Sequence, residues 1–154
     1  MDLPVAQLAK IVISQLQKIE QPIILLAHSK GGLVGRAVLA ANLPHIYGMV
    51  TFATPWNGSS RAAIFPPYHS MRSLLPNGSD TFSPWSAALE KEIAGKIISI
   101  TPRWDFHVPE GSFLQDAVNI PLSQSGHFRP LYHADGISAL RSALTQLKSR
   151  IPND

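Results

Sequence analysis

The chain has 154 residues, of which 45% are hydrophobic and 15% are charged, and its formal net charge is +3. This composition indicates one folded domain, residues 1–154, and excludes an intrinsically disordered chain. The basic residues are scattered, which argues against a nucleic-acid partner, and the absence of cysteine excludes disulfides and thiolate metal sites. No apolar run approaches the about 20 residues of a transmembrane helix. No signal-peptide pattern is visible, so a cytoplasmic protein is the default expectation.

Hydrophobic periodicity predicts an alternation of helices and strands. The first helix has Asp2 as its N-cap and an apolar stripe at helical spacing from Val5 to Ile19, and Gln21-Pro22 ends it. Because strands that alternate with helices form parallel sheets with right-handed crossovers, the fold class is α/β, a mostly parallel sheet flanked by helices. The strands are predicted at 23–27, 46–52, 96–101 and 117–122, and further helices at 33–41 and from residue 134 or 135 onward.

Residues 58–86 break this pattern and are predicted to be a lid-like insertion. Turn-forming sequences such as Pro66-Pro67 and Pro76-Asn77-Gly78 replace periodicity there. Insertions near an active edge often act as covers over a substrate. A surface loop packed on its own side chains is an equal alternative. The aromatic residues expected to be exposed, and able to contact an acyl chain, are Phe65, Tyr68, Phe82 and Trp85.

The turn at Ser29 joins the strand at 23–27 to the following helix. Its sequence has the pattern Ala-x-Ser-x-Gly, with Ala27 two positions before the serine and Gly31 two positions after it. A nucleophile elbow needs small residues at both positions because the turn is very sharp, and alanine is the mildest departure from glycine. Ser29 is therefore a candidate nucleophile, and an ordinary strand-to-helix connection is the alternative.

Two later strand ends supply an acid and a base. Asp105 follows the strand at 96–101, and His127 follows the strand at 117–122. Because parallel strands share their carboxyl edge, Ser29, Asp105 and His127 are expected to meet there in the order Ser…Asp…His. His127 would take the serine proton and Asp105 would orient the imidazole. The backbone N–H of Lys30 would stabilise the oxyanion, with the Lys30 side chain directed to solvent.

Other titratable groups compete for these roles. His133 is the rival base but lacks a strand-end glycine before it, and His107 follows the acid too closely to reach the serine. His28 is expected to point away from the nucleophile and pack against loops. A helix cap or a solvated loop accounts for the alternative acids, Asp116 and Asp135. No histidines or carboxylates recur at metal-ligand spacing, so neither a metal nor another cofactor is expected.

These motifs together resemble the α/β-hydrolase family, and within it the lipase and esterase branch. The stretch 51–59 is similar to the Thr-Pro-His-x-Gly-Ser stretch of those lipases, with Trp56 in place of the histidine. Residues 105–109 are similar to the family's Asp-x-x-Val-Pro, and Gly126-His127 to its Gly-His. The resemblance implies a serine carboxylic-ester hydrolase of lipid metabolism, which acts on lipid or small acyl esters through an acyl-enzyme. Thioesterase and acyltransferase chemistry use the same triad and stay open.

The sequence also departs from the family's pattern. The family domain ordinarily has several strands before the elbow, and a His-Gly-type segment after one of them supplies the second oxyanion N–H. Residues 1–22 have room for only one helix, so the chain is expected to correspond to the C-terminal portion of such a domain. The strand before Ser29 would then have an unpaired edge, which invites self-association. The alternative function is therefore a catalytically impaired remnant that needs a partner chain or acts only in binding.

Overall fold

The computed structural model describes residues 3–81 and 84–152, and within them it confirms the predicted alternation of helices and strands. Asp2, the expected N-cap of the first helix, lies outside the described residues. The helices and strands are α1 (Val5–Leu16), β1 (Ile23–His28), α2 (Lys30–Ala40), β2 (Ile46–Phe52), α3 (Ala87–Gly95), β3 (Ile97–Thr101), β4 (Val118–Pro121) and α4 (Ala134–Lys148). Short 3-10 helices lie at η1 (Ser60–Ile64), η2 (Ser70–Leu74) and η3 (Arg129–Leu131).

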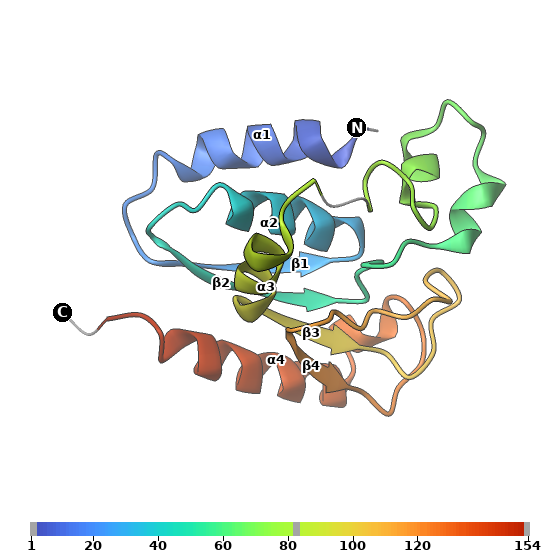
Figure 1. Cartoon of the computed structure of the whole chain (residues 1–154). Helices are drawn as coiled ribbons and strands as arrows, with labels where there is room; N and C mark the ends of the chain where they lie inside the picture. The colour runs from blue at the N-terminus through green and yellow to red at the C-terminus, as the bar shows by residue number, and fades with distance from the viewer. Residues whose placement is uncertain (1–2, 82–83, 153–154) are drawn as a thin grey trace.

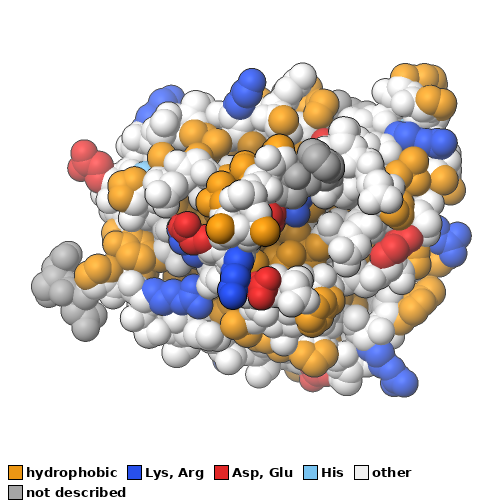
Figure 2. Space-filling view, viewed as in Figure 1, with side chains coloured by type: hydrophobic (Ala, Val, Ile, Leu, Met, Phe, Trp, Pro, Cys, Tyr) orange, Lys and Arg blue, Asp and Glu red, His pale blue; other side chains and the backbone are white. Residues whose placement is uncertain are grey.

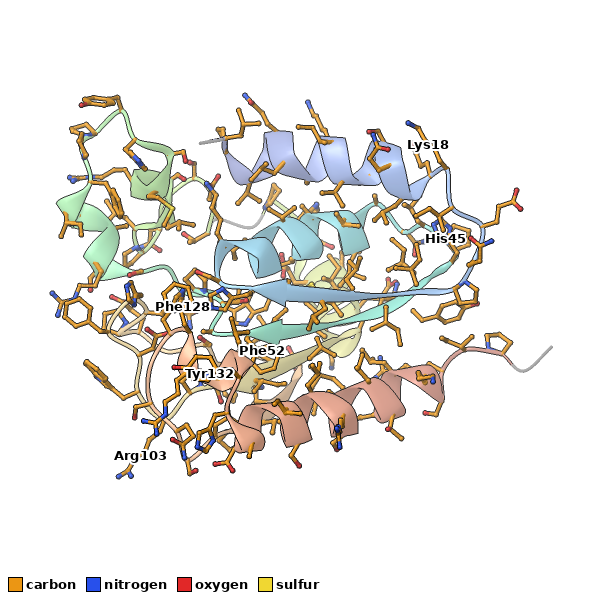
Figure 3. The ribbon with its side chains drawn as sticks, turned by 180° about the vertical axis from the view of Figure 1, so that it is seen from behind. Lys18, His45, Phe52, Arg103, Phe128 and Tyr132 are labelled. Carbon is orange, nitrogen blue, oxygen red and sulfur yellow. The ribbon has the colours of Figure 1, made fainter. Side chains whose placement is uncertain are left out.

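The four strands form one parallel sheet in the order β1-β2-β3-β4 (Figure 1). The fold class is therefore α/β with a parallel sheet, as predicted. Because all strands run in one direction, the loops after β1, β3 and β4 emerge at the same edge of the sheet. Seen from behind, Phe52, Phe128 and Tyr132 lie toward this carboxyl edge, and Lys18 and His45 lie at the opposite end (Figure 3).

Helices cover both faces of the sheet. Helices α1, α2 and α3 bury one apolar cluster against it, and α4 buries a second cluster on the other face (Figure 1). Neighbouring residues of a strand alternate between the two clusters, as the two-residue period of a strand requires. In β3, for example, Ile97 belongs to the first cluster and Ile98 to the second, and both are fully buried.

Helix α2 begins at Lys30, three residues earlier than the sequence indicated. Two glycines in its first turn, Gly31 and Gly32, weaken the helical pattern there because glycine is a poor helix former. The structure shows why a side chain is not tolerated at Gly32: a Cβ atom would lie 2.1 Å from the hydroxyl oxygen of Thr54. The glycine lets the start of α2 lie close to the loop after β2.

Helix α3 was not predicted. Only nine residues long, it buries just Ile93 and Ala94, so its apolar periodicity is too brief to stand out. Its N-cap is recognisable in retrospect, because the Ser86 hydroxyl accepts a hydrogen bond from the backbone N–H of Leu89.

The predicted insertion, residues 58–86, contains η1 and η2 and packs partly on itself. Tyr68 is 90% exposed, as expected. Phe65 is instead half-buried and stacks on His69, and Trp85 packs against the cluster under α1 and α2. The expected exposure of these two aromatics is therefore wrong, because each has a neighbour within the fold. Phe82 lies outside the described residues.

Charged side chains of both signs are scattered over the face shown in Figure 2, with apolar atoms between them. In the described part of the chain, no helix combines the length and the hydropathy that crossing a membrane requires.

Candidate active site

Ser29 occupies a strained turn between β1 and α2. Its φ of 54° and ψ of −129° are values that residues with a side chain rarely adopt, and such strain gathers at functional sites. The Ser29 backbone N–H continues the sheet by donating to the Phe52 carbonyl at 2.9 Å. A Cβ atom placed on Gly31 would lie 3.7 Å from the Cβ of Ala27. The residues two before and two after the serine therefore face each other at van der Waals contact distance.

Asp105 and His127 meet at the carboxyl edge of the sheet. The His127 Nδ1 atom and the Asp105 Oδ2 atom are 2.6 Å apart, and both side chains are buried. Asp105 comes from the loop after β3 and His127 from the loop after β4, as the spacing predicted. With Nδ1 donating to the carboxylate, the neutral ring leaves Nε2 as its acceptor.

The Asp105 carboxylate is stabilised in its charged form. Burial by itself raises the pKa of Asp105. The hydrogen bond and charge of His127, together with the backbone N–H groups of His107 and Val108, outweigh burial and hold the pKa of Asp105 below its ordinary value. The His107 N–H donates to Asp105 Oδ1 at 2.8 Å, so each carboxylate oxygen has a donor.

This pKa predicts an acid-dependent loss of stability. The pKa of an aspartate in an unfolded chain is about 3.9. The pKa of Asp105 in the folded protein lies below its unfolded value. The resulting stability is present above the unfolded pKa and is lost as the pH falls through the folded pKa. Urea unfolding between about pH 5 and pH 2 should therefore show a larger loss for the wild type than for Asp105→Asn, which cannot titrate. Equal losses would contradict the stabilising pair.

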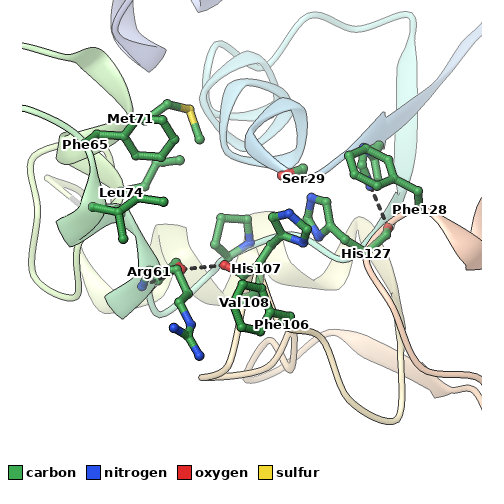
Figure 4. A pocket seen from close by; sticks show the side chains of 15 residues that line it. Ser29, Arg61, Phe65, Met71, Leu74, Phe106, His107, Val108, His127 and Phe128 are labelled. Carbon is green, nitrogen blue, oxygen red and sulfur yellow. Dashed lines mark hydrogen bonds between the residues drawn. The ribbon is translucent and has the colours of Figure 1, made fainter.

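Ser29 and His127 line the same cavity, whose volume is about 410 Å³. Figure 4 shows Ser29 beside the rings of His127 and His107. The Ser29 hydroxyl makes no hydrogen bond to any described residue, and it faces this space. The far wall is mostly apolar and comes from the 58–86 insertion: Ala62, Ile64, Phe65, Met71 and Leu74.

The Lys30 side chain was expected to be directed to solvent, and this expectation is wrong. It is only 17% exposed, and its Nζ donates to the Leu3 carbonyl at 2.9 Å and to the Ser70 hydroxyl at 3.2 Å. The same Nζ lies 3.7 Å from Asp80 Oδ2. Asp80 also accepts a hydrogen bond from the Val5 N–H and so caps α1. Lys30 is held because α1 and the insertion converge on the elbow, an arrangement that no local pattern reveals.

The backbone N–H of Lys30 lies at the N-terminus of α2. The first N–H groups of a helix have no acceptor within the helix, and the helix dipole favours negative charge at this end. The elbow therefore offers a donor next to Ser29, where charge would develop on an attacked carbonyl oxygen.

Two of the rival histidines, His28 and His133, have other partners. His28 Nε2 is 2.9 Å from the His127 carbonyl oxygen, and burial lowers the pKa of His28. His133 caps α4, with its Nδ1 accepting the Asp135 N–H at 3.4 Å. Asp135 in turn accepts from the Ser123 hydroxyl at 2.6 Å and does not line the cavity. The alternative acid Asp116 sits in the loop before β4 with a positive φ.

Comparison with known proteins finds similarity in structure and not in sequence. No protein-family model and no curated protein matches the sequence. The structure is similar to Bacillus licheniformis lipase BlEst2 in mature form, with a TM-score of 0.65, 14% identity, and coverage of 95% of this chain and 75% of that one. It is also similar to a Paleococcus ferrophilus monoacylglycerol lipase, with a TM-score of 0.62, 15% identity, and coverage of 97% and 77%.

A third similar structure is an extracellular α/β-hydrolase from a Paenibacillus species, with a TM-score of 0.56, 16% identity, and coverage of 99% of this chain and 81% of that one. The chain has the α/β-hydrolase fold. In this α/β-hydrolase fold β1 is an edge strand among the described residues, as expected from the absence of predicted strands before it.

The sequence did not reveal how the α/β-hydrolase fold secures its acid loop. The buried Ser59 hydroxyl donates to the His107 carbonyl, which fixes the loop that carries Asp105 against the insertion. Trp56 is buried and donates from Nε1 to the Ser99 hydroxyl at 3.0 Å. Its role in this chain is packing. A serine in a Gly-Ser turn was the only signal for Ser59, and such turns are common.

Proposed function

We propose that the chain is a serine carboxylic-ester hydrolase in which Ser29 is the nucleophile, His127 the base and Asp105 the orienting acid. One observation carries this proposal. The buried Asp105–His127 hydrogen bond lies beside a cavity that also receives the unpaired hydroxyl of Ser29 from a strained elbow. Two of the similar structures are a lipase and a monoacylglycerol lipase, which supports the same reaction class.

The proposed reaction proceeds through an acyl-enzyme. The Ser29 oxygen attacks the ester carbonyl carbon while His127 Nε2 takes the hydroxyl proton. The Lys30 N–H stabilises the oxyanion of the tetrahedral intermediate. His127 then gives its proton to the leaving alcohol as the carbon–oxygen bond breaks. A water molecule, deprotonated by the same ring, hydrolyses the acyl-enzyme and regenerates Ser29.

The cavity wall indicates the substrate class. Apolar side chains of the insertion face Ser29, and apolar walls bind acyl chains by removing them from water. We therefore propose lipid or small acyl esters as substrates and assign residues 58–86 as the substrate cover. Thioester substrates would fit the same geometry.

A fluorophosphonate probe tests the nucleophile. The probe phosphonylates an activated serine, so wild-type protein should be labelled and Ser29→Ala should not. Ser125→Ala is the matched control because Ser125 is an exposed serine in the loop before His127, and it should be labelled like the wild type. Equal labelling of Ser29→Ala and the wild type would remove the proposal.

The unpaired edge of β1 favours a second candidate, an impaired hydrolase completed by a partner chain. Among the described strands β1 pairs only with β2, none of its side chains from Ile23 to His28 carries a formal charge, and Leu26 is 59% exposed. Beside it lies a groove of about 230 Å³ lined by Leu131, Ile137 and Leu140. We propose a second copy of this chain as the occupant, because two uncharged edges related by a two-fold axis can pair antiparallel.

Sedimentation velocity tests this association. We expect the wild type to sediment as a dimer and Leu26→Lys as a monomer, since a lysine on an edge strand opposes pairing. Ile11→Lys, at an exposed position of α1, is the control and should remain a dimer. A wild-type monomer with full ester turnover would refute the second candidate.

A further inference from the structure

The loop that carries Asp105 brings another histidine to the Asp105–His127 pair. Asp105, His107 and His127 each offer one ligand atom, and these atoms lie within 4.8 Å of one another. Two imidazole nitrogens and one carboxylate oxygen form a donor set that suits zinc. No metal-ligand spacing along the chain predicts this set, because Asp105 and His107 lie in the loop after β3 and His127 lies in the loop after β4.

His107 is held by its backbone, while its ring nitrogens make no hydrogen bond to a described residue. The backbone N–H donates to Asp105 and the carbonyl accepts from Ser59. The side chain is 59% exposed, and neither ring nitrogen has a hydrogen bond to any described residue. The ring lies 4.8 Å from the His127 ring, centre to centre, and its Nδ1 is 3.8 Å from Asp105 Oδ1.

We propose that Asp105, His107 and His127 bind one Zn²⁺ ion, and that the bound ion inhibits the hydrolase. The inhibitory part rests on the proposed function, whereas the binding part does not. Zinc is typically bound at about 2.0–2.2 Å by such atoms in tetrahedral geometry, with one position left for water. The ligand atoms lie within 4.8 Å of one another, whereas His127 Nδ1 and Asp105 Oδ2, at 2.6 Å, are closer than two ligands of one tetrahedral ion. Zinc binding would therefore move the His127 ring or the carboxylate apart and rotate the exposed His107 ring inward.

The zinc ion and the proposed ester hydrolysis both require the His127 ring. Zinc at His127 Nδ1 would replace the proton shared with Asp105, and zinc at Nε2 would take the lone pair that accepts the Ser29 proton. In either case His127 can no longer act as the base. His28 is not counted as a ligand, since its Nε2 already bonds the His127 carbonyl. Nitrogen donors favour zinc over Mg²⁺ or Ca²⁺, which prefer oxygen.

Calorimetric titration of the full chain with Zn²⁺ tests binding without activity. In the Ser29→Ala background we expect one site per chain, and adding His107→Ala should weaken the affinity at least about 10-fold. His133→Asn, added to the same background, is the control because asparagine preserves the helix cap while removing a histidine. Equal affinity with and without His107, or more than one ion per chain at the same affinity, would overturn the site.

Fluorophosphonate labelling tests inhibition. The ratio of labelling rates with and without Zn²⁺ is measured within each variant, so differences in basal rate cancel. We expect at least about a 10-fold slowing in the wild type that a chelator reverses, little slowing in His107→Ala, and none with Mg²⁺. Equal slowing in both proteins would overturn the proposal. An unlabelled wild type whose Ser29→Ala form still binds one zinc would instead remove the proposed hydrolase, and the inhibition with it, and leave the zinc site in place.

Discussion

Replacing His127 by alanine is expected to lower kcat for ester hydrolysis by about 10⁴- to 10⁶-fold, the range seen when a serine hydrolase loses its base. The reason is that Ser29 has no other base beside it whose ring is already oriented by a buried carboxylate. The measurement is the steady-state hydrolysis of a short p-nitrophenyl ester, with folding checked by circular dichroism.

Two comparisons make this result specific. Asp105→Asn should lower kcat by about 10⁴-fold. The asparagine amide can donate a hydrogen bond to His127 Nδ1, which places the imidazole proton on Nε2 and leaves no lone pair there to accept the Ser29 proton. His133→Asn should leave kcat within about twofold, since His133 only caps α4. A folded His127→Ala protein with wild-type turnover would assign the base to another residue.

Replacing Ile98 by alanine is expected to lower the free energy of unfolding by about 2–5 kcal/mol. Ile98 is fully buried on β3, in the cluster between the sheet and α4. Removing its side chain leaves a cavity that the rigid sheet cannot close. Because domains of this kind are stable by only about 5–15 kcal/mol, urea denaturation should show a large shift of the midpoint.

The register supplies a matched control for this variant. Val118 on β4 is the direct partner of Ile98 across the sheet, but it is 39% exposed. Val118→Ala should therefore cost less than about 1 kcal/mol, in line with substitutions outside the core. If both variants cost the same, the assignment of the core to the centre of the sheet is wrong.

Hydrophobic periodicity was sufficient to locate the helices and strands that have many buried apolar residues. The strand at 46–52 was predicted with its observed bounds, because six of its seven residues are buried and most of them are apolar. Helix α4 was predicted to start at residue 134 or 135 and begins at Ala134. Helix α3 was missed because a short, mostly exposed helix has too few apolar positions to show a period.

Chain order was sufficient to bring Asp105 and His127 together, because both follow parallel strands and so share an edge. It could not reveal the surroundings of Lys30, whose side chain bonds Leu3, Ser70 and Asp80. These contacts join residues far apart in the sequence, and they depend on how the insertion folds over α1. His107 illustrates the same limit. Its position two residues after Asp105 led us to consider it only as an unsuitable base, and did not reveal that its ring lies next to the His127 ring.

The hydrogen bond from the Val5 N–H to Asp80 has a practical consequence for protein engineering. A carboxylate near the end of the 58–86 segment supplies a cap for α1 that no described neighbour in the sequence provides, and it also lies close to the ammonium group of Lys30 beside Ser29. Deleting this segment to widen access to the cavity would therefore fray the first helix and leave a lysine charge without its counter-ion. A shortened loop would have to keep an aspartate at the same place.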